Sequence, residues 1–243
     1  MTGRGALALA VTLLLVAATA RLGFWQLDRA AQKLALEQER QERARLPLLT
    51  LPDLAAAEGA RGDIWQRRAS LSGIWAADET IYLDNRTLQG RAGFYVITPL
   101  LLEDGRAVLV QRGWLPRDVA ERTRIAPYRT PPGAVQVSGL IAPQPSRMVE
   151  LGQAASGPIR QNVDIDAYAR ETRRRLLPFV VVQDSVRGGS AGSTDGLLRD
   201  WPPVTTGVHT NYGYALQWFA LCALLIGLYV WFQIIQPRRR ARG

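Results

Sequence analysis

The stretch "YALQWFALCALLIGLYVWFQII", Tyr214–Ile235, decides the fold class, because its 22 residues include no charged side chain. As a helix it rises about 33 Å, enough to cross the hydrocarbon core of a bilayer. Such helices often carry aromatic residues at both membrane surfaces. Here these are Tyr212, Tyr214 and Trp218 at one end, and Tyr229, Trp231 and Phe232 at the other. The stretch predicts a transmembrane helix at residues 209–236.

The tail "PRRRARG", residues 237–243, follows this helix directly and carries four arginines. Lysine and arginine next to a membrane helix mark the end that stays in the cytoplasm. We therefore expect a basic cytoplasmic tail.

A second apolar run lies at Ala6–Ala20, and "LGFWQL" extends it to Leu27 across Arg21. Fifteen residues of helix rise only about 22 Å, so a span needs the extension to Leu27. The Arg21 side chain must then either reach to the membrane surface or face protein. Residues 1–27 predict a first transmembrane helix. The alternative is a signal peptide cleaved after Ala20, because Ala18-Thr19-Ala20 has the small-x-small pattern of a cleavage site.

Two spans place both termini in the cytoplasm and the central domain in the periplasm. Arg21, Arg29 and Lys33 lie on the exported side of the first span and weigh against this orientation. A long translocated domain overrides short-range charge, so the C-terminal arginines decide. The N-terminus has no arginine-rich amphipathic transit segment, which favours a bacterial inner membrane over a mitochondrial one.

Composition narrows the function classes. The net charge is +9, yet no aromatic–basic motif or zinc spacing indicates nucleic-acid binding. Catalysis with a nucleophile needs a base beside it. The single histidine, His209, and the single cysteine, Cys222, are about 20 Å apart along one helix. With no phosphate loop, serine elbow or zinc histidine pair either, we predict that the chain is not an enzyme.

Between the spans, residues 28–46 are rich in helix formers and predict a charged helical stalk. Residues 47–208 predict a β-rich domain with a flexible loop near 188–196, "GGSAGSTDG". Glu103-Asp104-Gly105 indicates a hairpin, and Asp164 is a plausible cap for the domain's helix. Strands are expected at 64–75, 80–85, 93–102, 106–115, 134–141 and 179–185, and a helix at 163–176. The predicted class is a membrane α+β protein, two transmembrane helices flanking an antiparallel β-dominated domain with one or two helices.

Three stretches resemble the Surfeit-locus protein one family of cytochrome c oxidase assembly factors, in the family's order and over effectively the whole chain. "LGFWQLDRAAQK" is similar to its signature at the end of the first span. "GFYVITPLLLEDGRAVLVQRGWLPRD" is similar to its central block, and "GYALQWFAL" to the start of its second span. The matching residues include Gly23, Trp25, Gln26, Arg29, Lys33, Arg112, Gly113, Trp114, Tyr214 and Trp218. This resemblance places Trp25 and Arg29 at the end of a membrane anchor that is kept in the mature protein, which disfavours cleavage after Ala20.

The resemblance implies that the chain helps to build the haem-copper oxidase, together with other assembly factors, by acting on subunit I when haem a is inserted. It also implies transient haem a binding through a histidine just before the second span. In the family pattern that histidine stands three residues before the tyrosine, where this chain has Asn211. His209, two residues upstream, is the candidate axial ligand, and on a helix it would lie on nearly the opposite face. If the segment is a loop, the offset can be absorbed.

Arg112 is a candidate contact for a haem propionate, because arginine pairs with carboxylates in bidentate geometry. Its alternative role is a structural arginine of a strand or turn. Two alternative functions stay open: a two-span scaffold that steadies subunit I without binding haem, and an envelope signalling protein unrelated to respiration.

Overall fold

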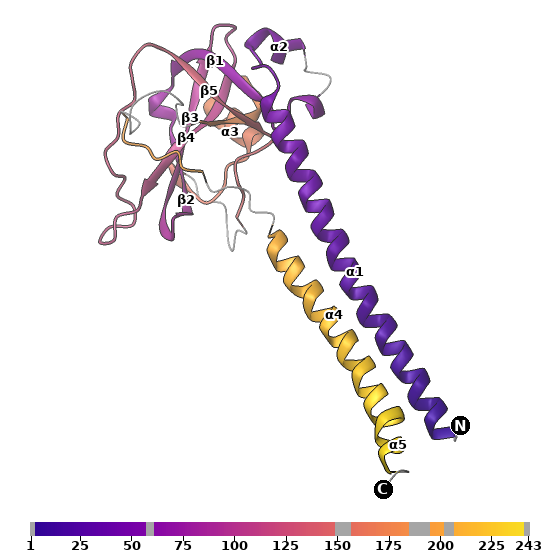
Figure 1. Ribbon diagram of the computed structural model, residues 1–243. Helices are drawn as coiled ribbons and strands as arrows, with labels where there is room; N and C mark the ends of the chain where they lie inside the picture. The colour runs from indigo at the N-terminus through magenta and orange to yellow at the C-terminus, as the bar shows by residue number, and fades with distance from the viewer. Residues whose placement is uncertain (1–2, 57–60, 149–156, 185–194, 202–206, 241–243) are drawn as a thin grey trace. The chain divides into compact units, whose positions relative to one another are not determined.

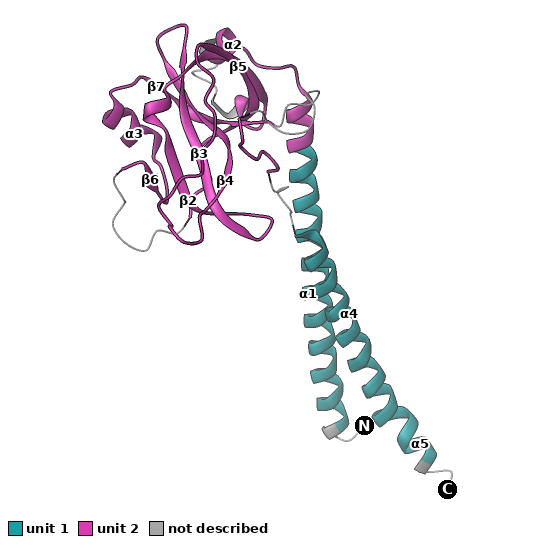
Figure 2. Cartoon of the chain, turned by 90° about the vertical axis from the view of Figure 1, so that its left-hand side faces the viewer, with its two compact units in different colours: residues 1–39, 204–243 teal, residues 40–203 magenta. Residues whose placement is uncertain are grey.

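The computed structural model describes residues 3–56, 61–148, 157–184, 195–201 and 207–240 (Figure 1). The chain divides into two units, which we describe separately: residues 1–39 with 204–243, and residues 40–203 (Figure 2). The loop predicted near 188–196 falls largely outside the described residues.

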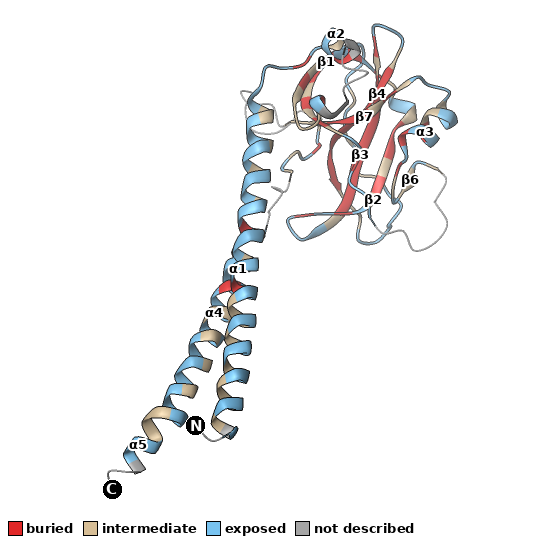
Figure 3. Ribbon diagram, turned by 90° about the vertical axis from the view of Figure 1, so that its right-hand side faces the viewer, coloured by how far each residue is buried: buried red, intermediate tan, exposed pale blue. Residues whose placement is uncertain are grey.

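The first unit contains two helices long and apolar enough to cross a membrane. Helix α1 covers Gly3–Arg45, and α4 covers Val208–Val230, continuing through a π-helical turn, Trp231–Ile235, into α5, Gln236–Arg240. Most of their surface is exposed (Figure 3), as expected of segments that are solvated by lipid tails. The predicted class is confirmed: two membrane helices flank a β-rich domain.

The second unit is built around a seven-stranded sheet with the order β1-β5-β7-β4-β3-β2-β6. β1 also pairs with β3, so β1, β5, β7, β4 and β3 form a closed ring. The strands are β1 Arg68–Trp75, β2 Ile81–Leu88, β3 Arg91–Leu102, β4 Ala107–Pro116, β5 Ala134–Ala142, β6 Ile159–Arg160 and β7 Leu176–Gln183. The short helices are α2 Leu51–Ala56, α3 Ile165–Thr172 and the 3-10 turns Arg61–Ile64 and Ala77–Glu79.

The core of this unit has two main parts. One contains apolar side chains from all five ring strands, including Leu71, Leu100 and Phe179, and therefore fills the ring. The other lies between α3 and strands β2, β3, β4 and β7, with Tyr168 and Trp114 among its members. Alternation along β1, where Ala69, Leu71 and Trp75 are buried, produces the inward face.

Several predicted elements are confirmed. The hairpin at Gly105, whose φ is 78°, joins β3 to β4. The Asp164 side chain accepts a hydrogen bond from the Ala167 N–H at 2.9 Å and caps α3. The sheet is mostly antiparallel, but the β4–β7 and β2–β6 pairings are parallel, which the sequence analysis did not predict.

Four predicted boundaries are wrong. β1 begins at Arg68 rather than at residue 64, because Arg61–Ile64 forms a 3-10 turn. β2 does not end at Asp84-Asn85 but bulges there, with Asn85 at φ 60°, and continues to Leu88. The third helix does not reach residue 176, because Arg173 adopts a left-handed conformation and the chain enters β7. β7 begins before Pro178 rather than after it, and the register against β4 shifts around this proline, which has no N–H to donate.

Candidate functional site

The helix pair of the first unit is joined by a chain of hydrogen bonds that we call the polar clamp: Gln26, Lys33 and Asn211. The Lys33 ammonium donates to Asn211 Oδ1 at 2.7 Å, and Asn211 Nδ2 donates to Gln26 Oε1 at 2.6 Å. Gln26 and Lys33 are seven residues apart, so they lie on the same face of α1. Both ends of the Asn211 amide are therefore occupied by α1.

An apolar contact continues this interface along the helices. Gly23 is buried on α1, and a Cβ at this position would lie 2.7 Å from the Phe219 ring of α4. Phe219 also packs edge-on against Phe24, with ring centroids 5.3 Å apart. The signature glycine thus permits the close approach of an aromatic side chain.

His209 lies on a different face of α4. The helix begins at Val208, after Gly207 in a left-handed conformation, so the segment is helical and the loop alternative is wrong. Two residues correspond to about 200° of rotation, which separates His209 from Asn211. His209 is exposed and makes no side-chain hydrogen bond with any residue the structure describes. His209 therefore does not reach the helix face on which Asn211 lies.

Other predicted contact residues of the first unit are also exposed. The exposed fraction is 49% for both Trp25 and Tyr214, whereas Trp218 is half-buried. The Arg29 guanidinium lies 5.9 Å from the Trp25 ring centroid. The signature is thus divided: Gly23 and Gln26 contact α4, while Trp25 and Arg29 remain available to lipid or a partner.

Arg112 in the second unit belongs to a β-bulge. Val96 pairs with Gly113 and Ile97 with Gln111, which leaves Arg112 as the extra residue of β4. Its side chain is only 1% exposed, and its guanidinium lies 4.6 Å from the Trp75 ring centroid and 5.5 Å from that of Tyr128. The bulge directs a charged side chain between two aromatic rings.

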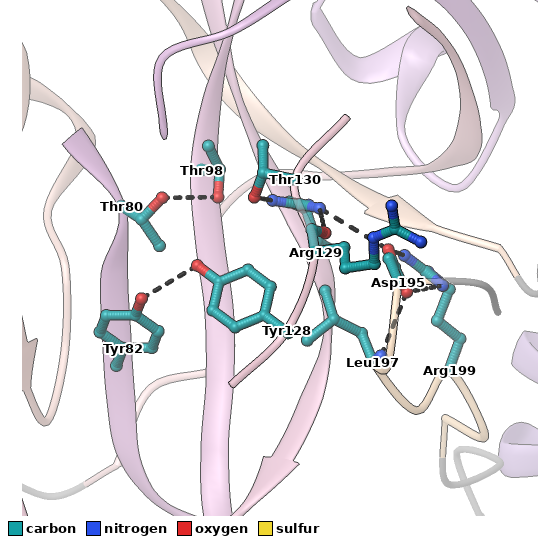
Figure 4. Close-up of polar contacts among 10 residues, drawn as sticks. Thr80, Tyr82, Thr98, Tyr128, Arg129, Thr130, Asp195, Leu197 and Arg199 are labelled. Atoms are coloured by element: carbon teal, nitrogen blue, oxygen red, sulfur yellow. Dashed lines mark hydrogen bonds and ion pairs between the residues drawn. The ribbon is translucent and has the colours of Figure 1, made fainter. Parts of the chain in front are cut away.

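The terminal nitrogens of Arg112 are bound within the domain. Nη1 donates to Thr130 Oγ1 at 2.7 Å, and Nη2 donates to the Arg129 carbonyl at 3.1 Å. Asp195 Oδ2 lies 3.6 Å from Nη2 and also pairs with Arg199 at 2.5 Å. Figure 4 shows Asp195 between Arg199 and the backbone N–H of Leu197. Burial lowers the pKa of Arg112, while Tyr128 and Asp195 oppose that shift.

The remaining central-block residues have structural contacts. Trp114 is 1% exposed and donates from Nε1 to the Arg86 carbonyl at 2.8 Å. A Cβ at Gly113 would lie 2.6 Å from Leu197 Cβ, so this glycine admits the segment that follows Asp195. Arg112, Gly113 and Trp114 therefore hold the domain together rather than line an exposed site.

Comparison with known proteins identifies the family to which the chain belongs. A model of the SURF1 family matches residues 13–223. The chain belongs to the SURF1 family. A SURF1-like protein of Rickettsia conorii is 24% identical over 216 residues, covering 86% of this chain and 84% of the relative. Surfeit locus protein 1 of Arabidopsis thaliana is 30% identical over 118 residues, covering 44% of this chain and 33% of the relative. SURF1 membership supports a role in oxidase assembly at the level of the family.

The residues predicted to bind haem a do not fit a resident haem. In this SURF1 chain, Asn211 stands where the family resemblance implies the haem-binding histidine, and its amide is bound at both ends. His209 is exposed on the face turned away from Asn211. The terminal nitrogens of Arg112 are already bound, which leaves it no exposed group for a propionate. The roles of His209 and Arg112 in haem binding stay predictions without support from this geometry.

The partners of the named residues were not predicted from the sequence. Lys33 was predicted as a signature residue and as a charge beyond the first span, although its spacing from Gln26 and Ala30 places all three on one helical face. That pattern, with the sole lysine of the chain, could have indicated a polar contact between the helices. No local pattern indicates that Asp195 reaches Arg112, because they are 83 positions apart in sequence.

Proposed function

We propose that this chain assists the assembly of haem-a cytochrome c oxidase by binding subunit I at the stage when haem a is inserted. The chain sits in the bacterial inner membrane with both termini in the cytoplasm and the central domain in the periplasm. Family membership supports the assembly role, and the two apolar helices support the membrane location.

The observation that carries the proposal is the division of the family residues on the helix pair. Gly23 and Gln26 are used within the chain, but Trp25, Arg29 and Tyr214 are exposed. Aromatic and arginine side chains are enriched in protein interfaces, where they bury large areas. We assign this exposed set as the contact surface for subunit I.

Photo-crosslinking tests this assignment in cells that make the oxidase. A photoreactive amino acid replaces Trp25 or Tyr214, and Ala30, which is 0% exposed, serves as the matched inward position. We expect subunit I to be captured from positions 25 and 214 but not from position 30. Capture of no oxidase subunit from either exposed position would contradict the proposal.

The polar clamp favours a scaffold that carries no resident haem. Asparagine amides are not typical iron ligands, and haem proteins use histidine, cysteine, methionine or tyrosine. We expect the full chain, purified from cells that make haem a, to show no Soret band. A Soret band that disappears in His209→Ala and persists in Gln217→Ala would instead assign haem a to the outward face of α4.

A further inference from the structure

A pocket of about 400 Å³ lies at the open end of the β3–β4 hairpin. Arg91 begins β3, and the Arg117 N–H donates to the Ala92 carbonyl at 3.1 Å, directly after β4. The lining residues are Arg91, Ala92, Pro116, Arg117, Asp118, Val119 and Arg122. Neither the helix pair nor the Arg112 cluster includes any of them.

The pocket has a net positive charge, and two of its three arginines have no side-chain partner among the described residues. Arg91 and Arg122 are exposed, and neither makes a side-chain hydrogen bond or ion pair with a described residue. Arg117 shares a 3.2 Å ion pair with Asp84. The cations therefore have donor groups available for an anion with several oxygens.

The one acidic lining residue is committed to its own loop. Asp118 Oδ1 accepts the N–H groups of Ala120 and Glu121 at 2.8 and 3.1 Å. These hydrogen bonds lower the pKa of Asp118, so its carboxylate stays ionised at neutral pH. Glu121 and Arg124 of the same loop lie outside the lining and offset one another in charge.

An apolar residue accompanies the cations. Val119 lies between Asp118 and Ala120 and is 100% exposed, so its whole side chain is accessible to an apolar ligand. The domain that carries it is continuous at both ends with helices able to cross a membrane. These helices tether the domain to a bilayer, and tethering raises the effective concentration of headgroups around the domain.

We propose that this pocket binds the phosphate of an anionic phospholipid headgroup, with Arg91 and Arg122 on the phosphate oxygens and Val119 against the start of the acyl region. The arginines supply the charge recognition, and the valine distinguishes a lipid from a free phosphate. The site is independent of the proposed role in oxidase assembly.

The test uses the full chain in neutral detergent, titrated with short-chain phosphatidylglycerol and followed by native mass spectrometry. Arg91→Gln/Arg122→Gln removes the two free cations. Arg170→Gln/Arg175→Gln is the matched control, because both arginines are exposed and bind no described side chain. Each arginine near an anionic headgroup contributes about 1 kcal/mol, so the pocket variant should bind roughly 25-fold more weakly. The control pair should bind like the wild type.

Two further arms separate the possible ligands. Glycerol phosphate, which has no acyl chains, should bind more weakly than phosphatidylglycerol, and Val119→Ser should reduce this difference. Equal binding by the pocket and control variants would overturn the site. Glycerol phosphate that binds as tightly as the lipid, with no effect of Val119→Ser, would overturn the lipid assignment. Thermal unfolding of Arg91→Gln/Arg122→Gln should match the wild type, since exposed substitutions cost little stability.

Discussion

The Lys33 ammonium on α1 donates a hydrogen bond to Asn211 Oδ1 on α4 at 2.7 Å, and Asn211 Nδ2 in turn donates to Gln26 Oε1 on α1. This chain of hydrogen bonds fixes which faces of the two helices meet, because Gln26 and Lys33 share a partner on the opposite helix. In this chain the clamp uses the position where the family resemblance implies an iron ligand. The residue that sets the pairing of the helices is thus the residue that departs from the pattern.

Asn211→Ala should weaken the helix pair. It leaves Lys33 and Gln26 without their shared partner, and interhelical hydrogen bonds in membranes are worth about 0.6 to 1.7 kcal/mol. Unfolding of the full chain in a detergent titration measures the loss. Gln217→Ala, an exposed polar position on the same helix, is the control and should have little effect. Additive effects of Gln26→Ala and Asn211→Ala in a double-mutant cycle would argue against a direct contact.

Gly23→Leu should separate the two helices. Even a Cβ would lie 2.7 Å from the Phe219 ring, so a larger side chain overpacks the interface. Overpacking costs about 1–3 kcal/mol, and Phe219→Ala should restore part of the loss by making room. Gly213→Leu is the matched control, because a Cβ there has no neighbour within 4 Å. Equal effects at positions 23 and 213 would show that the close contact is absent.

Arg112→Met should destabilise the β-rich domain. The substitution leaves Thr130, the Arg129 carbonyl and Asp195 without their buried cation, a change that costs about 3–5 kcal/mol. Thermal unfolding of the full chain detects it, with the exposed Arg170→Met as control. A variant that unfolds like the wild type would reopen a ligand-binding role for Arg112.

Stability should decline at alkaline pH through Tyr168. Burial raises the pKa of its hydroxyl from 10.0 to about 12, and the hydroxyl donates to the Glu79 carbonyl. The unfolded tyrosine ionises from pH 10 upward while the folded one stays neutral, so its contribution is complete below pH 10 and is lost as the pH rises to about 12. Burial also raises the pKa of Tyr82, which acts in the same direction. Unfolding measured from pH 9 to 12 should show a shallower decline in Tyr168→Phe, and an unchanged slope would contradict the assignment.

The sequence predicted the architecture because its signals are local. The length of the apolar run and the aromatic residues at its ends identify α4. Asp164 marks the start of α3 because its side chain accepts a hydrogen bond from Ala167, three residues later. The bulge at Asn85 and the early start of β7 escaped prediction because partner strands decide them. A turn-like pair such as Asp84-Asn85 serves equally well as a strand end or a bulge.

The candidate site was predicted as a set of residues but not as contacts. The resemblance named Gly23, Gln26, Arg112 and Trp114, and the structure brings Gly23 and Gln26 to α4 while it buries Arg112 and Trp114 in the domain. Whether a motif residue points inward or outward depends on the helix pairing and the bulge in β4, neither of which the sequence displays. The register of His209 was predictable, because helical geometry separates it from Asn211 once the helix begins at Val208.

The most direct test of the central claim is the amount of assembled haem-a oxidase in cells that lack this chain. Haem a absorbance of the membranes, together with subunit I abundance, measures assembly. The account predicts that both fall on deletion of the gene, and that the wild-type chain and His209→Ala restore them while Gly23→Leu does not. Unchanged haem a and subunit I in the deletion strain would contradict a role in oxidase assembly.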